Sequence, residues 1–158
     1  MQDPAAVAAL EKKLDAVLAE LLATSHGSRC TLRIDDAERG WSVQQICAEA
    51  LAPGVKSLRG DGSIDQRAAD TVAWMVKHKA NLIQPNLVDN PIPAPPPALM
   101  SAYAAKAQML GPLLEKDGYL TGWISVHYVD GFHTFTADEE RALDRARVEV
   151  ARLTGIGA

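Results

Sequence analysis

The sequence predicts an α+β fold, in which helices at the two ends of the chain pack against strands that lie between them. Three features predict it. Apolar residues recur at spacings of three and four over residues 1–24 and 136–154, as in amphipathic helices. Apolar and polar residues alternate over residues 29–34 and 119–128, as in strands with two different faces. Clusters of glycine and proline separate these segments.

The first predicted helix begins at Asp3-Pro4, because aspartate caps free N–H groups and proline is tolerated in the first turn. Its apolar stripe has the a/d spacing of a short coiled coil and consists of Val7, Leu10, Leu14, Val17 and Leu21. Two interpretations stay open. The stripe packs on the sheet of its own chain, or it forms a seam with a second copy.

The last predicted helix begins at a capping box made by Thr136 and Glu139, and it ends at Gly155. It carries a stripe with the same spacing, formed by Leu143, Ala146, Val150 and Leu153. The chain is therefore expected to begin and end with helices of matched character.

The first predicted strand, residues 29–34, has a polar side formed by Arg29, Thr31 and Arg33. Residues 41–51 are expected to return as the second strand. Arg33 is a candidate contact for an anion, and the alternative is an ordinary solvent-facing or ion-paired arginine.

A helix is predicted from about residue 64 to residue 79, with Ser63 or Asp61 as its cap. Arg67 does not suit the positive end of the helix dipole, so we expect it to point into a cavity instead. The two glycines of the preceding Gly60-Asp-Gly62 loop either expose backbone N–H groups to an anion or form an ordinary flexible loop.

A β-hairpin is predicted over residues 108–128, with a type I′ turn at Asp117-Gly118. The alternation after the turn puts Tyr119, Thr121, Trp123, Ser125 and His127 on one face and apolar residues on the other. A face that carries an indole, hydroxyls and an imidazole can bury apolar surface and still offer hydrogen bonds, as a small-molecule site requires.

Five of the nine prolines lie in residues 91–97, which favours a stiff extended segment. This segment either recruits a peptide-binding domain or crosses one end of the fold. A short helix over residues 98–105 is expected to present Met100 and Tyr103 beside it.

Composition excludes several functional classes. A net charge of −4 argues against a nucleic-acid surface. No apolar run is long enough to cross a bilayer, and the N-terminus lacks the pattern of a secretion signal, so a cytoplasmic location is expected. Cys30 and Cys47 are expected to be reduced thiols. His127 and His133 are poorly spaced as metal ligands, and no dinucleotide or hydrolase motif is present, so no metal or cofactor is expected.

The hairpin segment Leu110-Gly-Pro-Leu-Leu-Glu-Lys-Asp-Gly-Tyr-Leu-Thr-Gly-Trp-Ile-Ser-Val126, followed by an acidic helix start, resembles the closing part of a GAF domain. The resemblance implies one layered α/β/α domain over residues 1–158. It further implies a central antiparallel sheet of about five to six strands, terminal helices on one face, and a helix with a proline-rich lid on the other. Bilin-binding members usually carry a Cys-His pair on the cavity helix, and here that helix offers Trp74 and His78 without a cysteine.

The favoured hypothesis is a sensor or regulatory domain that holds a small organic molecule between sheet and lid and dimerises through its terminal helices. The residues expected to line the ligand are Trp123, Ser125, His127, Gln108, Tyr103, Met100, Trp74, Arg33 and Arg67. Two alternatives remain. One is an enzyme that uses His127 as general base, assisted by Ser125 or Tyr103, and the other is a protein-interaction module whose cavity is vestigial.

Overall fold

Five antiparallel strands form one sheet in the order β2-β1-β5-β4-β3, as seen in a computed structural model that describes residues 1–157. The strands are β1 (Arg29–Ile34), β2 (Ala48–Leu51), β3 (Leu82–Gln84), β4 (Ala107–Leu114) and β5 (Leu120–Tyr128). The helices are α1 (Pro4–Ser25), α2 (Asp70–His78), α3 (Pro97–Ser101) and α4 (Ala137–Thr154). Two short 3₁₀ turns, η1 (Ala37–Arg39) and η2 (Gln66–Ala68), complete the elements.

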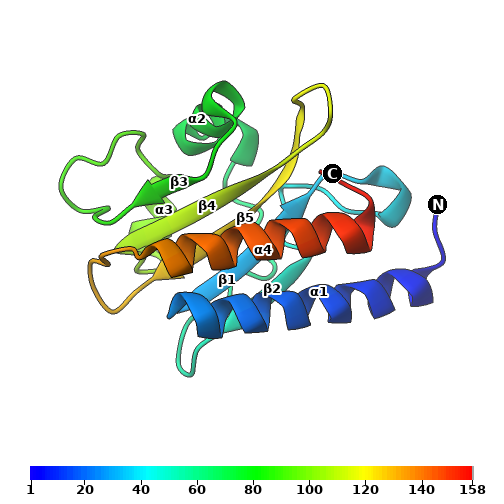
Figure 1. Cartoon of the computed structure of the whole chain (residues 1–158), viewed down its shortest axis with the longest axis horizontal. Coiled ribbons are helices and arrows are strands. Elements are labelled where there is room, and N and C mark those ends of the chain that lie inside the picture. The colour runs from blue at the N-terminus through cyan, green and yellow to red at the C-terminus, as the bar shows by residue number, and fades with distance from the viewer. Residues whose placement is uncertain (158) are drawn as a thin grey trace.

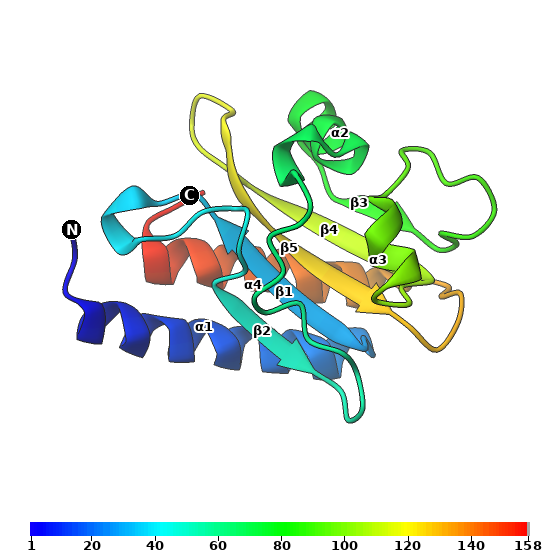
Figure 2. The ribbon, with the colours of Figure 1, turned by 180° about the vertical axis from the view of Figure 1, so that it is seen from behind.

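The two terminal helices lie side by side across one face of the sheet, whereas α2, α3 and the long connections cover the other face (Figures 1 and 2). The predicted fold class is therefore confirmed. Both faces are covered, and all nine residues of the central strand β5 are buried. Between residues 1 and 157, no helix combines the length and the apolar character that crossing a membrane requires.

The core beneath α1 and α4 is apolar and continuous. Leu14, Leu18 and Leu21 of α1 are fully or almost fully buried against the sheet, and Leu143 and Val150 of α4 join them. Two of the five predicted stripe residues, Leu14 and Leu21, are thus buried within their own chain. Leu18 was not part of the predicted stripe, and Val7, Leu10 and Val17 are only half-buried at its edge.

Both helix starts follow the sequence prediction. The Asp3 side chain accepts from the Ala5 N–H at 3.2 Å, and the Thr136–Glu139 capping box is complete. The buried carboxylate of Glu139 also accepts from His26 Nδ1 and His133 Nε2, each at 2.9 Å. This carboxylate therefore joins the end of α1 to the beginning of α4.

The predicted type I′ hairpin turn is wrong. Within residues 1–157, positive φ in this turn occurs at Gly118 (88°) and not at Asp117. The Glu115 carbonyl accepts from the Gly118 N–H at 2.8 Å, and the Glu115 N–H donates to the Tyr119 carbonyl at 2.9 Å. The Asp117 carboxylate accepts from the Tyr119 N–H, so a three-residue loop with glycine in the left-handed region replaces the two-residue turn.

A bulge after this loop changes which side chains face the candidate site. The β4–β5 register passes from Gly122 to Leu120 and skips Thr121. Leu120 therefore packs with Trp123 on the α2 side, while the Thr121 hydroxyl donates to Glu115 at 3.0 Å. Tyr119 lies outside the strand and is exposed. The predicted alternation holds from Trp123 onward and is wrong for these three residues.

The short helix expected over residues 98–105 spans Pro97–Ser101, and three further features also differ from prediction. The second strand covers residues 48–51 rather than 41–51, with Trp41 forming only an isolated bridge to Asp36. The helix expected over residues 64–79 is split into η2 and α2, because Ala69 has extended backbone dihedrals. Neither Ser63 nor Asp61 caps α2, whose N-cap is Ala69 without a side-chain bond.

Candidate functional site

Polar side chains form rows across the middle of the sheet, on the face away from α1 and α4. In the β1–β5 register, Arg29 lies opposite His127 and Thr31 lies opposite Ser125. The β4–β5 register continues the first of these rows to Gln108, and the β3–β4 register continues it to Gln84. Antiparallel pairing brings residues about 100 positions apart in the chain within reach of one another.

This polar face forms the floor of a small cavity of about 40 Å³, covered by η2, α2 and α3. This volume is small beside the about 300–1,000 Å³ of pockets that hold drug-sized ligands. It is lined by Thr31, Arg33, Leu58, Ile64, Gln66, Thr71, Val72, Pro96, Leu99, Gln108, Leu110, Trp123, Ser125 and His127. The site is thus small, partly open and mixed in polarity.

Five of the nine predicted ligand contacts line this one cavity. They come from β1, β4 and β5 and are Arg33, Gln108, Trp123, Ser125 and His127. All five are at most 5% exposed. Their contact with a ligand stays a prediction, but the structure brings them together as the strand pattern indicated.

The other four predicted residues do not line the cavity. Tyr103 and Met100 pack in a neighbouring cluster, and it is Leu99 of α3 that reaches the cavity. Trp74 stacks near His78 at an outer groove. Arg67 bonds the Leu120 carbonyl and the Asp35 carboxylate, so the expectation that it points into the cavity is wrong.

Arg29 is the principal residue that the sequence interpretation missed. It is completely buried, and its guanidinium donates to His127 Nδ1 at 3.0 Å, the Lys56 carbonyl at 2.9 Å and the Tyr103 carbonyl at 3.1 Å. A signal was present, because Arg29 shares the polar side of β1 with Thr31 and Arg33. Arg29 connects the cavity wall to both the loop before η2 and the segment after α3.

Burial, followed by the charges of Arg29 and Arg33, holds the pKa of His127 well below its ordinary value. The imidazole is therefore neutral. Because the Arg29 Nε–H donates to Nδ1, the single ring proton is on Nε2. The ring nitrogen without a protein partner, Nε2, carries the proton and can only donate. A general base must accept a proton, so this arrangement does not suit that role.

The segments that cover the cavity are bonded to the sheet and to each other. The Tyr103 hydroxyl donates to Asp61, which joins the segment after α3 to the loop before η2. Gln108 Nε2 donates to Gln84 Oε1 at 2.8 Å, and Gln84 Nε2 donates to the Pro93 carbonyl at 2.7 Å. The proline-rich segment is thereby connected to the floor of the cavity.

No protein-family model matches this sequence, and no curated protein matches it either. Solved structures do match. The GAF domain of the cyanobacteriochrome TePixJ superimposes with a TM-score of 0.71 at 11% identity, covering 92% of this chain and 88% of that one. The chromophore-binding domain of the Stigmatella aurantiaca bacteriophytochrome gives 0.69 at 18% identity, covering 92% and 54%. The phycocyanobilin-bound GAF domain of a cyanobacterial phytochrome gives 0.64 at 17% identity, covering 91% and 85%. These superpositions show that this chain has the fold of a GAF domain.

Proposed function

We propose that this chain is a sensor or regulatory domain that binds a small molecule in the cavity between β1, β5 and β4 and the segments that cover them. The observation that carries the proposal is the set of polar side chains that are buried around this cavity. Ser125 and Thr31 have hydroxyl groups there, and His127 has the Nε2–H. Buried polar groups require partners, and a ligand or ordered water supplies them here.

The similar solved structures support a small-molecule site in this fold, because one is phycocyanobilin-bound and another is a chromophore-binding domain. The ligand of this chain is smaller than a typical bound organic molecule, since pockets for drug-sized ligands measure about 300–1,000 Å³. Covalent attachment is not favoured. Burial raises the pKa of the Cys30 thiol, and it raises the pKa of Cys47 to about 12, so both thiols stay protonated.

The experiment is native mass spectrometry of protein purified without added ligand, followed by calorimetry against a panel of small metabolites. Binding is expected in the wild type and in Trp74→Ala, whose indole lies at the outer groove. It is expected to fail in Trp123→Ala, whose indole lines the cavity. Ser125→Ala is a milder second variant, because Trp→Ala in a core costs about 3–5 kcal/mol of stability. A protein without added mass that binds nothing in the panel contradicts the proposal.

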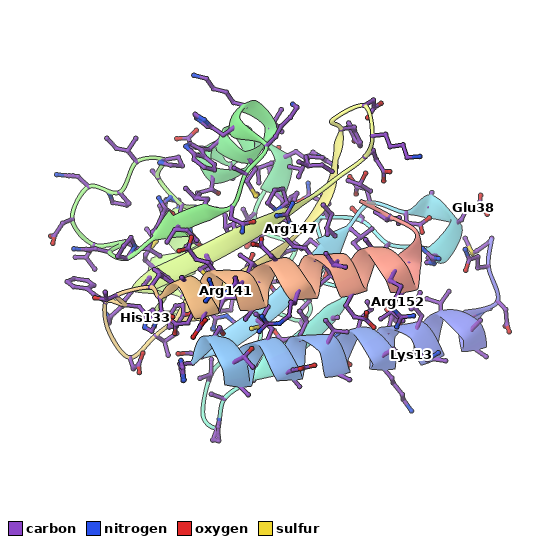
Figure 3. All side chains as sticks on the ribbon, in the orientation of Figure 1. Lys13, Glu38, His133, Arg141, Arg147 and Arg152 are labelled. Atoms are coloured by element: carbon purple, nitrogen blue, oxygen red, sulfur yellow. The ribbon has the colours of Figure 1, made fainter. Side chains whose placement is uncertain are left out.

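The same proposal includes a homodimer formed through the terminal helices. A groove of about 500 Å³ runs between α1 and α4, with Val17, Leu21 and Leu153 among its apolar lining. Charges of both signs line it, and Figure 3 shows Lys13 and Arg152 at the junction of the two helices. A two-fold interface requires such a self-complementary surface.

Light scattering at increasing protein concentration tests this assembly. Ala16→Arg adds a bulky charge to the groove and should give a monomer. Ala19→Arg places the same side chain on an exposed position of α1 outside the lining and should leave the dimer intact. A wild-type mass that equals one chain at every concentration contradicts dimerisation.

A further inference from the structure

Two arginines are buried on one strand beside the cavity without a carboxylate in contact. Arg29 is 0% and Arg33 is 5% exposed, and within residues 1–157 neither lies within 4.0 Å of an acidic oxygen. Elsewhere in the chain Arg39 and Arg67 have aspartate partners at 2.9 and 2.6 Å. Buried charge is costly unless it is paired, and here Glu49 and Asp61 act on the two arginines only from beyond contact distance.

The nearest acidic groups do not neutralise these arginines by contact. The Glu49 carboxylate accepts from the Ser57 hydroxyl and the Leu58 N–H. The Asp61 carboxylate accepts from Ser63 and from the Tyr103 hydroxyl. No aspartate or glutamate from residues 1–157 lines the cavity itself. The cavity lining therefore holds the guanidinium of Arg33 and no carboxylate.

The donors around the cavity are largely free. The Arg33 guanidinium has five N–H donors and gives one hydrogen bond, to the Val43 carbonyl at 2.9 Å. In the described part of the chain, the sealed side-chain atoms without a partner are Ser25 Oγ and Arg39 Nε. The unused donors of Arg33 are therefore not sealed in protein. Arg33 lines the cavity, so its Nε and Nη2 are the donors available to a ligand there.

The volume limits what these donors can hold. A cavity of about 40 Å³ favours a ligand of few non-hydrogen atoms over a drug-sized molecule. A guanidinium matches the spacing of two oxygens on a planar anion, and each charge-assisted bond is about twice as strong as a neutral one.

We propose that the ligand of this site is a compact planar oxyanion, a small carboxylate or nitrate-like ion, paired with Arg33 and bonded by the His127 Nε2–H and the Ser125 hydroxyl. This inference depends on the proposed function and specifies the chemistry of the same site. It follows from the unpaired buried cation, the free donors and the size of the cavity.

The test compares acetate with acetamide, which has the same shape without the charge. Calorimetric or NMR titration of the wild-type protein, with sodium chloride balancing ionic strength, is expected to show acetate binding at least tenfold tighter than acetamide. Formate and nitrate are titrated in parallel. Tighter binding of acetate or formate identifies the ligand as an organic carboxylate, and tighter binding of nitrate identifies it as an inorganic oxyanion. This comparison needs no variant, so it stands even where a substitution fails to fold.

Two variants locate the effect. Arg33→Gln removes the charge in the cavity and should abolish the preference for acetate, whereas Arg67→Gln removes an arginine outside the cavity and should retain it. If acetate and acetamide bind equally well, or if Arg33→Gln still prefers acetate, the ligand is not an anion paired with Arg33. Either result leaves the proposed small-molecule site intact. If neither probe binds and native mass spectrometry finds a larger molecule, the compact size is overturned. If nothing is bound in any assay, the proposed function falls as well.

Discussion

Acidification below about pH 6 is expected to destabilise the folded chain through the imidazole of His127. This side chain is 3% exposed and accepts a hydrogen bond from Arg29 Nε. Burial, together with the charges of Arg29 and Arg33, holds the pKa of His127 well below its ordinary value of 6.5. In the unfolded chain the ordinary pKa returns, so the unfolded state takes up a proton that the folded state does not bind.

The size of the effect follows from this difference of one proton. The free energy of unfolding falls by about 1.4 kcal/mol per pH unit once the pH is below the unfolded pKa and above the folded one. Summed from about pH 7.5 to about pH 5, the loss is about 2 kcal/mol. The stabilisation is complete above the unfolded pKa and is lost as the pH falls.

Urea unfolding followed by circular dichroism at several pH values measures this loss. The matched variant is His127→Gln, whose amide oxygen accepts from Arg29 and does not titrate. The other three histidines are present in both proteins, so the difference between the two pH profiles isolates His127. Parallel profiles from about pH 7.5 to about pH 5 would refute a buried neutral imidazole at this position.

Three further predictions concern stability. Arg29→Met leaves three acceptors without a donor and should lower the free energy of unfolding by about 3 kcal/mol, at about 1 kcal/mol each. The exposed Arg141→Met, outside the groove between α1 and α4, should change it by less than about 0.5 kcal/mol in the same urea experiment. Similar losses in both variants would argue against the role of Arg29. Leu18→Ala, in the core beneath the terminal helices, should lower the free energy of unfolding by about 2–5 kcal/mol. The exposed Val148→Ala should lower it by about 0.5 kcal/mol or less, and equal thermal midpoints for the two variants would contradict the packing of α1. Burial raises the pKa of Glu139, but bonds from two histidines and a backbone N–H outweigh it and hold the pKa below 4.5. The free energy of unfolding should therefore fall as the pH drops below about 4.5, and it should fall less steeply in Glu139→Gln. Identical pH profiles would contradict stabilisation by the ionised Glu139 carboxylate.

The candidate site was predictable from the sequence where a single strand carries its pattern. Trp123, Ser125 and His127 follow the two-residue period of β5, and Arg33 follows that of β1. The period did not show that Arg29 bonds His127, because that contact depends on the register between strands far apart in the chain. Arg67 was misplaced because its Asp35 partner lies 32 residues away.

The sequence by itself determined the terminal helices with their caps, the polar sides of two strands and the resemblance to a GAF domain. These are local properties of hydrogen bonding and periodicity, and neighbouring residues suffice to specify them. Tertiary structure alone decided the bulge that turns Leu120 toward α2 and the interruption of the helix at Ala69. It also decided how little volume the covering segments leave above the floor. Cavity size and buried charge balance depend on how closely distant segments pack, and this is not encoded in the spacing of residues along any one of them.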